Sequence, residues 1–225
     1  GDRAAIAIGD EGVVLVRGRD RQLRGFANVC RHRGHELLPC GTAERGRFLA
    51  CPYHAWVYDL DGSLHQVPAA HRPDVPAADY PLLPVAVSEW HGFVFVNLTG
   101  SAAPLDQAAP GLAELIEPYR CAELRVGARH SYDLRANWKL AVENYHECFH
   151  CPGIHPQLCR VSSPTSGADA EAKGLWCGGS MELEPGVETM ALDGRSLGVP
   201  IEGLAGNALR TVWYLQVFPN LLLSL

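Results

Sequence analysis

Two short segments of the chain each place one cysteine beside one histidine. Cys30 and His32 form the first pair, Cys51 and His54 form the second, and residues 33–50 lie between them. Each pair follows a strand-like stretch, so each is expected to lie on a tight loop. Zinc binds the same side chains, but zinc fingers place a Cys pair before a His pair. One Cys and one His from each of two loops instead favour a [2Fe–2S] cluster, in which two Cys hold one iron and two His hold the other.

The composition agrees with a metal-binding globular chain. Its 225 residues include 8 cysteines and 10 histidines. Eight cysteines in a small secreted domain would suggest a disulfide framework. A chain of this length with 47% hydrophobic residues can bury a core without such cross-links, and several of its cysteines stand next to a histidine. The net charge of −6, without a Lys/Arg cluster, argues against nucleic acid or an anionic membrane as a partner. No apolar run approaches the roughly 18–20 residues that span a bilayer.

The first hundred residues have the pattern of a small antiparallel β domain. Asp61-Gly62 separates two strand-like stretches and is typical of a β-hairpin turn. The Pro-containing stretch 101–110 has the composition of a linker, so we predict one domain over residues 1–100 and a second over residues 101–225. In the first domain, strands are expected over residues 13–16, 23–29, 47–50, 56–60, 63–67, 85–87 and 93–98.

The second domain mixes helical and strand patterns. We predict helices over 112–116 and 138–150, strands over 126–134 and 212–218, and a loop over 162–180. Pro152-Gly153 is expected to end the longer helix, because proline cannot donate to the helical ladder. The chain stops within the apolar stretch 221–225, and a folded domain rarely ends by exposing such an edge. We therefore expect a fragment that is incomplete at both ends.

The helical pattern over 138–150 carries a second group of ligand-type side chains. At 3.6 residues per turn, Glu147 and His150 lie on one helix face. The break at Pro152-Gly153 lets His155 fold back toward His150. Two histidines with neighbouring carboxylates suit a 2-His-1-carboxylate Fe(II) site.

Other side chains near these motifs have competing interpretations. Cys148 and Cys151 form a C-x-x-C pair, which indicates dithiol chemistry in a thioredoxin-like context, although no such context precedes it. His146 is either a further ligand or a residue beside the ligands. Cys40 has no partner in the sequence and is expected to be a buried apolar thiol.

Both segments resemble those of a known family. Cys30-Arg31-His32-Arg33-Gly34 and Cys51-Pro52-Tyr53-His54-Ala55-Trp56 resemble the Rieske boxes of aromatic-ring-hydroxylating oxygenases, and residues 137–156 resemble the mononuclear-iron motif of Rieske oxygenase α subunits. His35 and Tyr53 stand where respiratory Rieske proteins carry an additional disulfide. The resemblance implies a low-potential [2Fe–2S] cluster bound by Cys30, His32, Cys51 and His54.

The resemblance also implies roles for the second segment. His150 and His155 would be two of the three ligands of a mononuclear Fe(II), and the third, a carboxylate, would lie beyond Leu225. Glu147 would be the acidic residue that links the two metal centres, by accepting hydrogen bonds from His54 and His150 across a subunit interface. Aromatic-ring dioxygenases usually have Asp at this position, so Glu147 looks closer to the betaine, choline and carnitine branch.

The fold implied is α+β, with an N-terminal antiparallel β Rieske domain before part of a helix-grip-like catalytic domain built on an antiparallel sheet. The function implied is a cytoplasmic, homotrimeric terminal oxygenase, which uses O₂ to hydroxylate or N-demethylate a quaternary ammonium or aromatic small molecule. Its electrons would come from NAD(P)H through a separate reductase, with or without a ferredoxin. Three aromatic residues could form a cage for a quaternary ammonium, or could belong to the core: Trp176, Trp213 and Tyr214.

Two other function classes remain open from the sequence. A Rieske ferredoxin-type electron carrier would account for residues 1–98 but leaves the second motif without a purpose. A zinc-binding structural module would use the same Cys and His side chains without redox chemistry.

Overall fold

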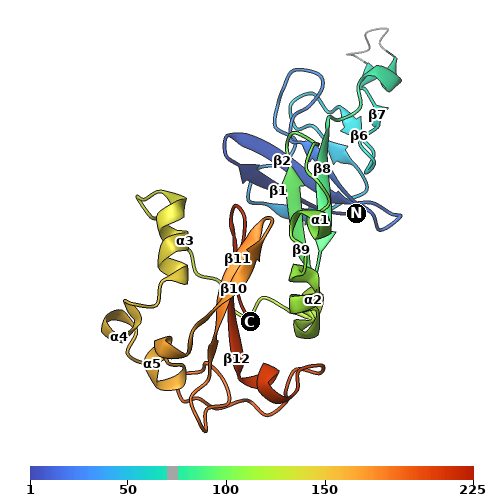
Figure 1. The fold of residues 1–225 in the computed structure, drawn as a ribbon. Helices are drawn as coiled ribbons and strands as arrows, with labels where there is room; N and C mark the ends of the chain where they lie inside the picture. Colours follow the sequence, from blue (N-terminus) through green and yellow to red (C-terminus); the bar gives the residue numbers. More distant parts are fainter. Residues whose placement is uncertain (70–75) are drawn as a thin grey trace. The chain divides into compact units, whose positions relative to one another are not determined.

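The computed structural model of the chain describes residues 1–69 and 76–225 and divides them into two units, Gly1–Ala102 and Ala103–Leu225. Antiparallel sheets organise both units, and helices occur chiefly in the second (Figure 1). The predicted α+β class is therefore confirmed.

A six-stranded sheet forms the larger part of the first unit. Its strand order is β4-β1-β2-β3-β8-β9, and every neighbouring pair is antiparallel. Val13, Val14 and Val16 are fully buried, which explains the strong strand signal of this stretch. The strands are β1 (Asp2–Ile8), β2 (Glu11–Arg17), β3 (Leu23–Ala27), β4 (Ala43–Arg45), β8 (Pro84–Trp90) and β9 (Phe93–Asn97).

A three-stranded sheet of β5 (Leu49–Ala50), β6 (Val57–Tyr58) and β7 (Leu64–Gln66) forms the rest of this unit, followed by the 3₁₀ turn η2 (Ala77–Asp79). The predicted Asp61-Gly62 turn joins β6 to β7. Gly62 has φ 90°, and a Cβ at this position would lie 2.4 Å from a ring carbon of Phe26. Glycine is required here by both the left-handed backbone and the contact.

The core of the first unit lies between the two sheets and includes both motif cysteines. Cys30 and Cys51 belong to a single cluster of buried side chains. Folding of this unit therefore places two sulfur atoms in an apolar interior. The other members of the cluster are Ala5, Val14, Val16, Phe26, Leu37, Leu38, Leu49, Trp56, Tyr58, Leu60, Leu64 and Leu82.

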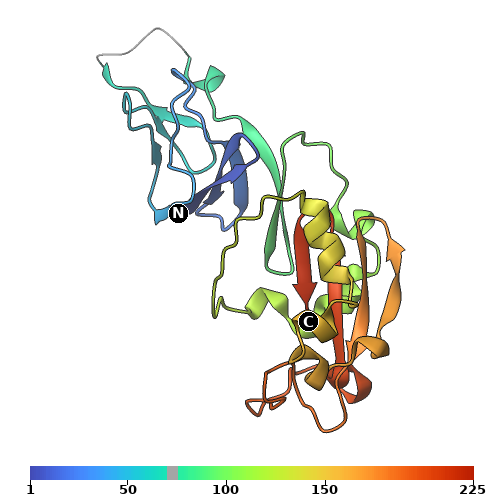
Figure 2. The ribbon, with the colours of Figure 1, turned by 90° about the vertical axis from the view of Figure 1, so that its left-hand side faces the viewer.

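The second unit is built on an antiparallel sheet with the order β10-β11-β12-β13, comprising β10 (Ala168–Lys173), β11 (Trp176–Glu182), β12 (Thr211–Val217) and β13 (Leu221–Ser224). Its register pairs Trp176 with Val217 and Leu215 with Leu223, so these side chains share one face. Tyr214 pairs with Ser224 and lies on the opposite face. In Figures 1 and 2, α3 (Trp138–His146) covers one face of the sheet and α2 (Leu112–Ile116) lies on the other.

Local contacts fix the helices of this unit. Asn137 caps α3 by accepting a hydrogen bond from the Lys139 N–H over 3.0 Å. The Trp176 indole N–H donates to the Pro110 carbonyl over 2.9 Å and joins β11 to the segment before α2. No helix in the described part of the chain is long and apolar enough to cross a membrane. The remaining helical segments are α1 (Leu105–Ala108), η3 (Glu117–Tyr119), η4 (Cys121–Glu123), α4 (Cys151–Ile154), α5 (Leu158–Val161), η5 (Pro164–Ser166) and η6 (Gly206–Arg210).

Three predicted elements of the second unit are wrong. Residues 126–134 form no strand, because no neighbouring strand pairs with them, and Val126 and Tyr132 are 76% and 81% exposed. Residues 162–180, predicted as a loop, contain β10 and the start of β11. Their small residues have a packing role, since a Cβ at Gly178 would lie 2.2 Å from the Tyr214 carbonyl oxygen. The helix predicted over 138–150 ends at His146.

Candidate metal centres

The two Cys–His loops of the first unit share one backbone hydrogen-bond pattern. The N–H of Cys30 and the N–H of Cys51 each donate to the carbonyl five residues later over 2.8 Å. The carbonyls of the same two cysteines accept from Gly34 and Ala55, four residues later, over 3.0 Å. Gly34 and Ala55 both have left-handed backbones, with φ 70° and 52°. The paired motif in the sequence thus corresponds to two loops of matching structure.

The thiols of both loops lie in the core. Cys30 is 2% exposed and Cys51 is 3% exposed, and neither forms a disulfide. The Tyr58 hydroxyl lies 3.3 Å from the Cys30 sulfur and accepts a hydrogen bond from the Arg31 N–H over 3.0 Å. Burial raises the pKa of the Cys30 thiol and, as the main cause, also raises the pKa of Tyr58. The phenol therefore keeps its proton and can donate it in a hydrogen bond to the sulfur.

The imidazoles of the two loops lie side by side and are only half-buried. The rings of His32 and His54 are 4.7 Å apart between centroids, at 74°, and His32 stacks on Trp56 at 4.9 Å. Two imidazoles that share one ion need a separation of this order, because each metal–nitrogen bond is about 2.1 Å long. A buried pair of sulfur donors beside a more exposed pair of nitrogen donors fits the ligand set of a Rieske cluster.

His35 and Tyr53 lie against each other, with ring centroids 5.3 Å apart. These are the positions at which respiratory Rieske proteins, by the resemblance noted above, carry a disulfide. Their contact shows that the two loops meet here as well, through side chains that cannot be cross-linked.

Glu147 ends α3 and turns the chain toward His150. Its backbone is extended, with φ −95°, and its N–H donates to the Glu143 carbonyl. The expectation that Glu147 and His150 share one helix face is therefore wrong. They meet instead because the Glu147 carboxylate folds over the next turn: one oxygen accepts from the His150 N–H over 3.1 Å, and the other lies 3.3 Å from His150 Nδ1. This contact holds the imidazole by Nδ1 and leaves Nε2 for a metal.

The structure brings His150 and His155 together. A new helical turn, α4, starts at Cys151 and carries His155 at its end, so Pro152 begins this turn and does not end a longer helix. The two rings are 5.2 Å apart between centroids, at 76°. This is the separation that two ligands of one ion would show.

Glu147 contacts His150 at Nδ1 but does not complete a three-ligand site. Over residues 1–69 and 76–225, no three His, Cys, Asp or Glu side chains gather in an arrangement that could hold one metal ion. In the second unit the residues fit two of the three ligands of a mononuclear iron.

Sequence reasoning missed the contacts that fix α3 and the following turn on the sheet. The Tyr145 hydroxyl donates to the Leu223 carbonyl of β13 over 2.6 Å and lies 2.9 Å from the Ser224 hydroxyl. Its ring packs against Tyr214, at 5.9 Å between centroids. The Cys148 thiol lies 3.7 Å from the Met181 sulfur of β11. From the sequence, Tyr145 is only an aromatic residue on one helix face, because the residues that it contacts lie far along the chain.

The structure also places the other side chains for which the sequence suggested a role. Cys40 is exposed, so its prediction as a buried thiol is wrong. A cage of Trp176, Trp213 and Tyr214 is excluded by the register, which places Tyr214 on the face opposite the two tryptophans. His146 is partly buried, and burial lowers its pKa.

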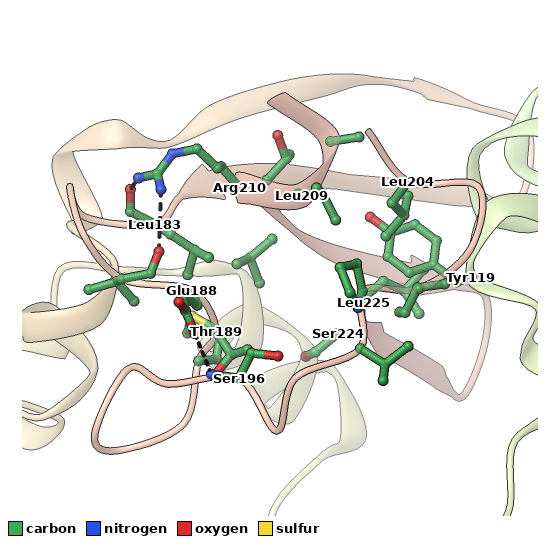
Figure 3. A pocket seen from close by; sticks show the side chains of 18 of the residues that line it. Tyr119, Leu183, Glu188, Thr189, Ser196, Leu204, Leu209, Arg210, Ser224 and Leu225 are labelled. Atoms are coloured by element: carbon green, nitrogen blue, oxygen red, sulfur yellow. Dashed lines mark hydrogen bonds between the residues drawn. The ribbon is translucent and has the colours of Figure 1, made fainter. Parts of the chain in front are cut away.

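A cavity of about 680 Å³ lies in the second unit (Figure 3). Its lining is mostly apolar, with Tyr119 as an aromatic wall and Glu188 and Arg210 as charged members. The Arg210 guanidinium donates to the carbonyls of Leu183, Glu184 and Val187 over 2.5–3.3 Å, so it fixes the loop that borders the cavity. None of the three aromatic residues considered for a cage lines this cavity.

Comparison with known proteins matches each unit to a family. Residues 1–115 match the Rieske [2Fe-2S] domain, and residues 121–225 match the ring hydroxylating alpha subunit (catalytic domain). The carnitine monooxygenase oxygenase subunit of Escherichia coli K12 is 43% identical over 65% of this chain and 40% of its own length. The glycine betaine monooxygenase oxygenase subunit of Chromohalobacter salexigens is 38% identical over 70% of this chain and 35% of its own length.

Solved structures agree with the family matches. A quaternary ammonium Rieske monooxygenase aligns with a TM-score of 0.79 and 29% identity over 97% of this chain and 56% of its own. Naphthalene 1,2-dioxygenase from Rhodococcus sp. aligns with a TM-score of 0.79 over 100% of this chain and 56% of its own, and at 23% identity it supports the fold alone.

The matched Cys–His loops on an antiparallel β unit define a Rieske-type iron–sulfur protein. With its second unit included, the chain belongs to the Rieske oxygenase α-subunit family and is related to carnitine and glycine betaine monooxygenase oxygenase subunits. It spans 40% of the length of the E. coli relative and 35% of the C. salexigens relative.

Proposed function

We propose that this chain carries the electron-accepting centre and two iron ligands of an oxygenase that oxidises a quaternary ammonium compound. The observation that carries the proposal is the pair of donor sets: Cys30, Cys51, His32 and His54 in one unit, and His150 with His155 in the other. When bound, the cluster supplies single electrons and the mononuclear iron supplies O₂ activation. A ferredoxin-type carrier would not need a second unit that matches a catalytic domain.

The four proposed cluster ligands and Tyr58 have separate roles in this proposal. The buried thiols of Cys30 and Cys51 would hold the iron that is shielded from water. The half-buried imidazoles of His32 and His54 would hold the outer iron, where electrons enter and leave. The Tyr58 hydroxyl, 3.3 Å from the Cys30 sulfur, would donate a hydrogen bond that stabilises negative charge on that sulfur.

Glu147 would position His150 and link the two centres. Its carboxylate contacts both the backbone N–H and Nδ1 of His150, which holds the ring and would leave Nε2 to bind the metal. The side chain of Glu147 is 43% exposed, so one carboxylate can also accept a hydrogen bond from His54 of a neighbouring subunit in a homotrimer. Such a bridge would join the outer ligand of one centre to a ligand of the other by a short polar path.

The electrons for this reaction would come from NAD(P)H through a separate reductase. The two relatives are named as oxygenase subunits, a term that implies a partner which supplies electrons. The half-buried His32 and His54 side chains would be the entry point for those electrons.

The named relatives support a betaine-like substrate over an aromatic one. The relatives reported above act on carnitine and glycine betaine, both of which combine a quaternary ammonium with a carboxylate. The reaction would be a hydroxylation that leads to loss of an N-linked carbon group.

Iron analysis of the purified full-length protein tests the division into two centres. In that protein we expect three iron atoms per chain, two in the cluster and one mononuclear. His150→Ala should lose the mononuclear iron and substrate turnover while it keeps the visible spectrum of the cluster. His130→Ala, which changes an exposed histidine of the same unit, is the matched control. Full iron content and turnover in His150→Ala would reject the assignment.

Substrate depletion with the reductase, NAD(P)H and O₂ tests the second part of the proposal. Carnitine, glycine betaine, choline and naphthalene should be offered separately, with loss of substrate and formation of aldehyde measured. Turnover of a zwitterionic quaternary ammonium is the expected result. Turnover of naphthalene alone would replace this substrate class by an aromatic one.

A further inference from the structure

The turn that carries His150 is bordered by two cysteines for which the proposed oxygenase reaction has no use. Cys148 and Cys151 occupy the first and fourth positions of this turn, and the Cys151 N–H donates to the Cys148 carbonyl over 3.1 Å. A turn closed in this way brings its end Cα atoms within about 7 Å of each other. Disulfides span about 4.4–6.8 Å between Cα atoms, so the backbone already has the required reach.

The side chains of this turn are also close to one another. The Cys148 thiol and the Cys159 thiol of α5 are both near enough to Cys151 to influence its pKa, which burial raises as the main cause. All three are free thiols, with Cys148 and Cys159 partly exposed and Cys151 buried. Because Cys148 is partly exposed, a small oxidant such as peroxide can reach its thiol.

We propose that Cys148 and Cys151 form a reversible disulfide when the protein meets hydrogen peroxide. The Cys148 sulfur attacks one peroxide oxygen, the O–O bond breaks, and water leaves with the displaced oxygen. The sulfenic acid formed on Cys148 is then attacked by the Cys151 sulfur, which forms the S–S bond and releases a second water. Two thiols are oxidised, one peroxide is reduced by two electrons, and the two thiol protons end in water.

The reduced turn and the oxidised turn cannot make the same contacts. In the reduced protein the Cys148 sulfur packs 3.7 Å from the Met181 sulfur on β11. A disulfide needs this atom to lie about 2.05 Å from the Cys151 sulfur, so we expect its position relative to Met181 to change. The contact between the turn and the sheet should then weaken, and His150 lies between the two cysteines. Oxidation should therefore weaken iron binding by His150, a consequence that rests on the proposed function.

Peptide mapping tests the disulfide itself, independently of any iron. The purified iron-loaded protein is treated with hydrogen peroxide, alkylated and digested, and the peptide containing residues 147–155 is analysed by mass spectrometry. A loss of two hydrogens with no alkylation of Cys148 or Cys151, reversed by dithiothreitol, is the expected result. Alkylation of both thiols after treatment, or a Cys151–Cys159 cross-link, would overturn the proposal.

Iron retention tests the consequence. After the same treatment, transfer of mononuclear iron to a chelator should become about tenfold faster, as expected when the support of a metal ligand is disturbed. The absorbance of the [2Fe–2S] cluster monitors damage in the other unit. Cys148→Ser should abolish this acceleration, and Cys159→Ser is the matched control that should retain it. If the disulfide forms but iron release is unchanged, the thiol pair has no effect on the metal site and that part is rejected; if untreated protein holds no mononuclear iron, the proposed function fails instead.

Discussion

The two donor sets of this chain are built in opposite ways. In the first unit, Cys30 and Cys51 are part of the core, and two matched loops hold them with four backbone hydrogen bonds. In the second unit, His150 is partly buried and His155 is exposed, on a turn and a four-residue helix that follow α3. Folding of the first unit therefore assembles its proposed ligands, whereas the second unit presents its proposed ligands at the surface. We expect metal binding to be coupled to stability in the first unit and nearly independent of it in the second.

Cys51→Ser should have the largest effect on the first unit. It removes a proposed cluster ligand and places a hydroxyl among buried apolar side chains, where burial of a polar group costs about 1–3 kcal/mol. Because the binding free energy of a structural metal is also folding free energy, the loss of the cluster adds to this cost. Visible absorbance should disappear and the thermal unfolding of this unit should shift to lower temperature. Cys40→Ser, at an exposed thiol of the same unit, is the control.

His155→Ala should separate metal binding from stability in the second unit. The side chain is exposed, so its removal should change the free energy of unfolding by no more than about 0.5 kcal/mol. Mononuclear iron should nevertheless be lost, while the cluster spectrum stays. A drop in unfolding temperature as large as that of Cys51→Ser would show that the two centres are not built as differently as their burial indicates.

Gly62→Ala should test how strongly the first unit specifies its loops. The added Cβ would lie 2.4 Å from a Phe26 ring carbon at a position with φ 90°, so both overpacking and backbone strain apply. Together these should destabilise the unit by about 2–4 kcal/mol, measured by denaturant unfolding. Gly34→Ala is the matched comparison, because no atom lies within 4 Å of its Cβ and only its φ of 70° opposes alanine. Gly34→Ala should lower the free energy of unfolding by about 1 kcal/mol. An equal loss in both variants would mean that the contact with Phe26 does not contribute to the effect of Gly62→Ala.

Glu147→Gln should affect communication more than metal content. Glutamine keeps the length of the side chain and an oxygen for the His150 N–H, but removes the negative charge that orients the imidazole. We expect both metals to remain bound and the reoxidation of the reduced cluster, with substrate and O₂ present, to slow by about tenfold or more. Glu143→Gln, on an exposed position of α3, is the control. Reoxidation at the original rate would show that electrons take a path that does not involve Glu147.

The sequence predicts which ligand-type side chains come together better than it predicts the elements that carry them. Cys and His side chains at a fixed spacing indicate metal binding from the sequence alone. The structure brings His32 close to His54 and His150 close to His155. The end of α3 at His146 could not be predicted, because the helical pattern continues to His150. Contacts from Tyr145 to β13 and from Cys148 to β11 decide where the chain leaves the helix.

Two strand assignments of the second unit failed for a related reason. Residues 126–134 have a strand-like sequence, but a strand also needs a partner, and none pairs with them among the described residues. The small residues around Gly178 and Gly179 resemble a loop, although they allow close approach of neighbouring backbones within a sheet. The sequence of a segment describes only its own side chains, whereas strand pairing depends on residues elsewhere in the chain.

His146 should give the second unit a weak pH dependence of its own. Burial lowers the pKa of this side chain from the ordinary value of 6.5, and its buried Nε2 has no hydrogen-bond partner in the described part of the chain. The unfolded chain therefore binds a proton more readily than the folded one. The contribution of His146 to stability is fully present above pH 6.5 and is lost as the pH falls through the lower pKa of the folded state.

Replacement of this histidine measures that contribution. His146→Phe fills a similar volume without a titratable group, so the free energy of unfolding of the second unit should decline less between neutral and acidic pH than in the original protein. His130→Phe changes an exposed histidine of the same unit and controls for the loss of a histidine in general. An unchanged decline in His146→Phe, or an equal change in both variants, would mean that the acid sensitivity arises elsewhere. His146 lies at the end of α3, just before Glu147. The pH dependence of unfolding therefore also compares the two units: acid should destabilise the unit that contains His150 while the first unit remains folded.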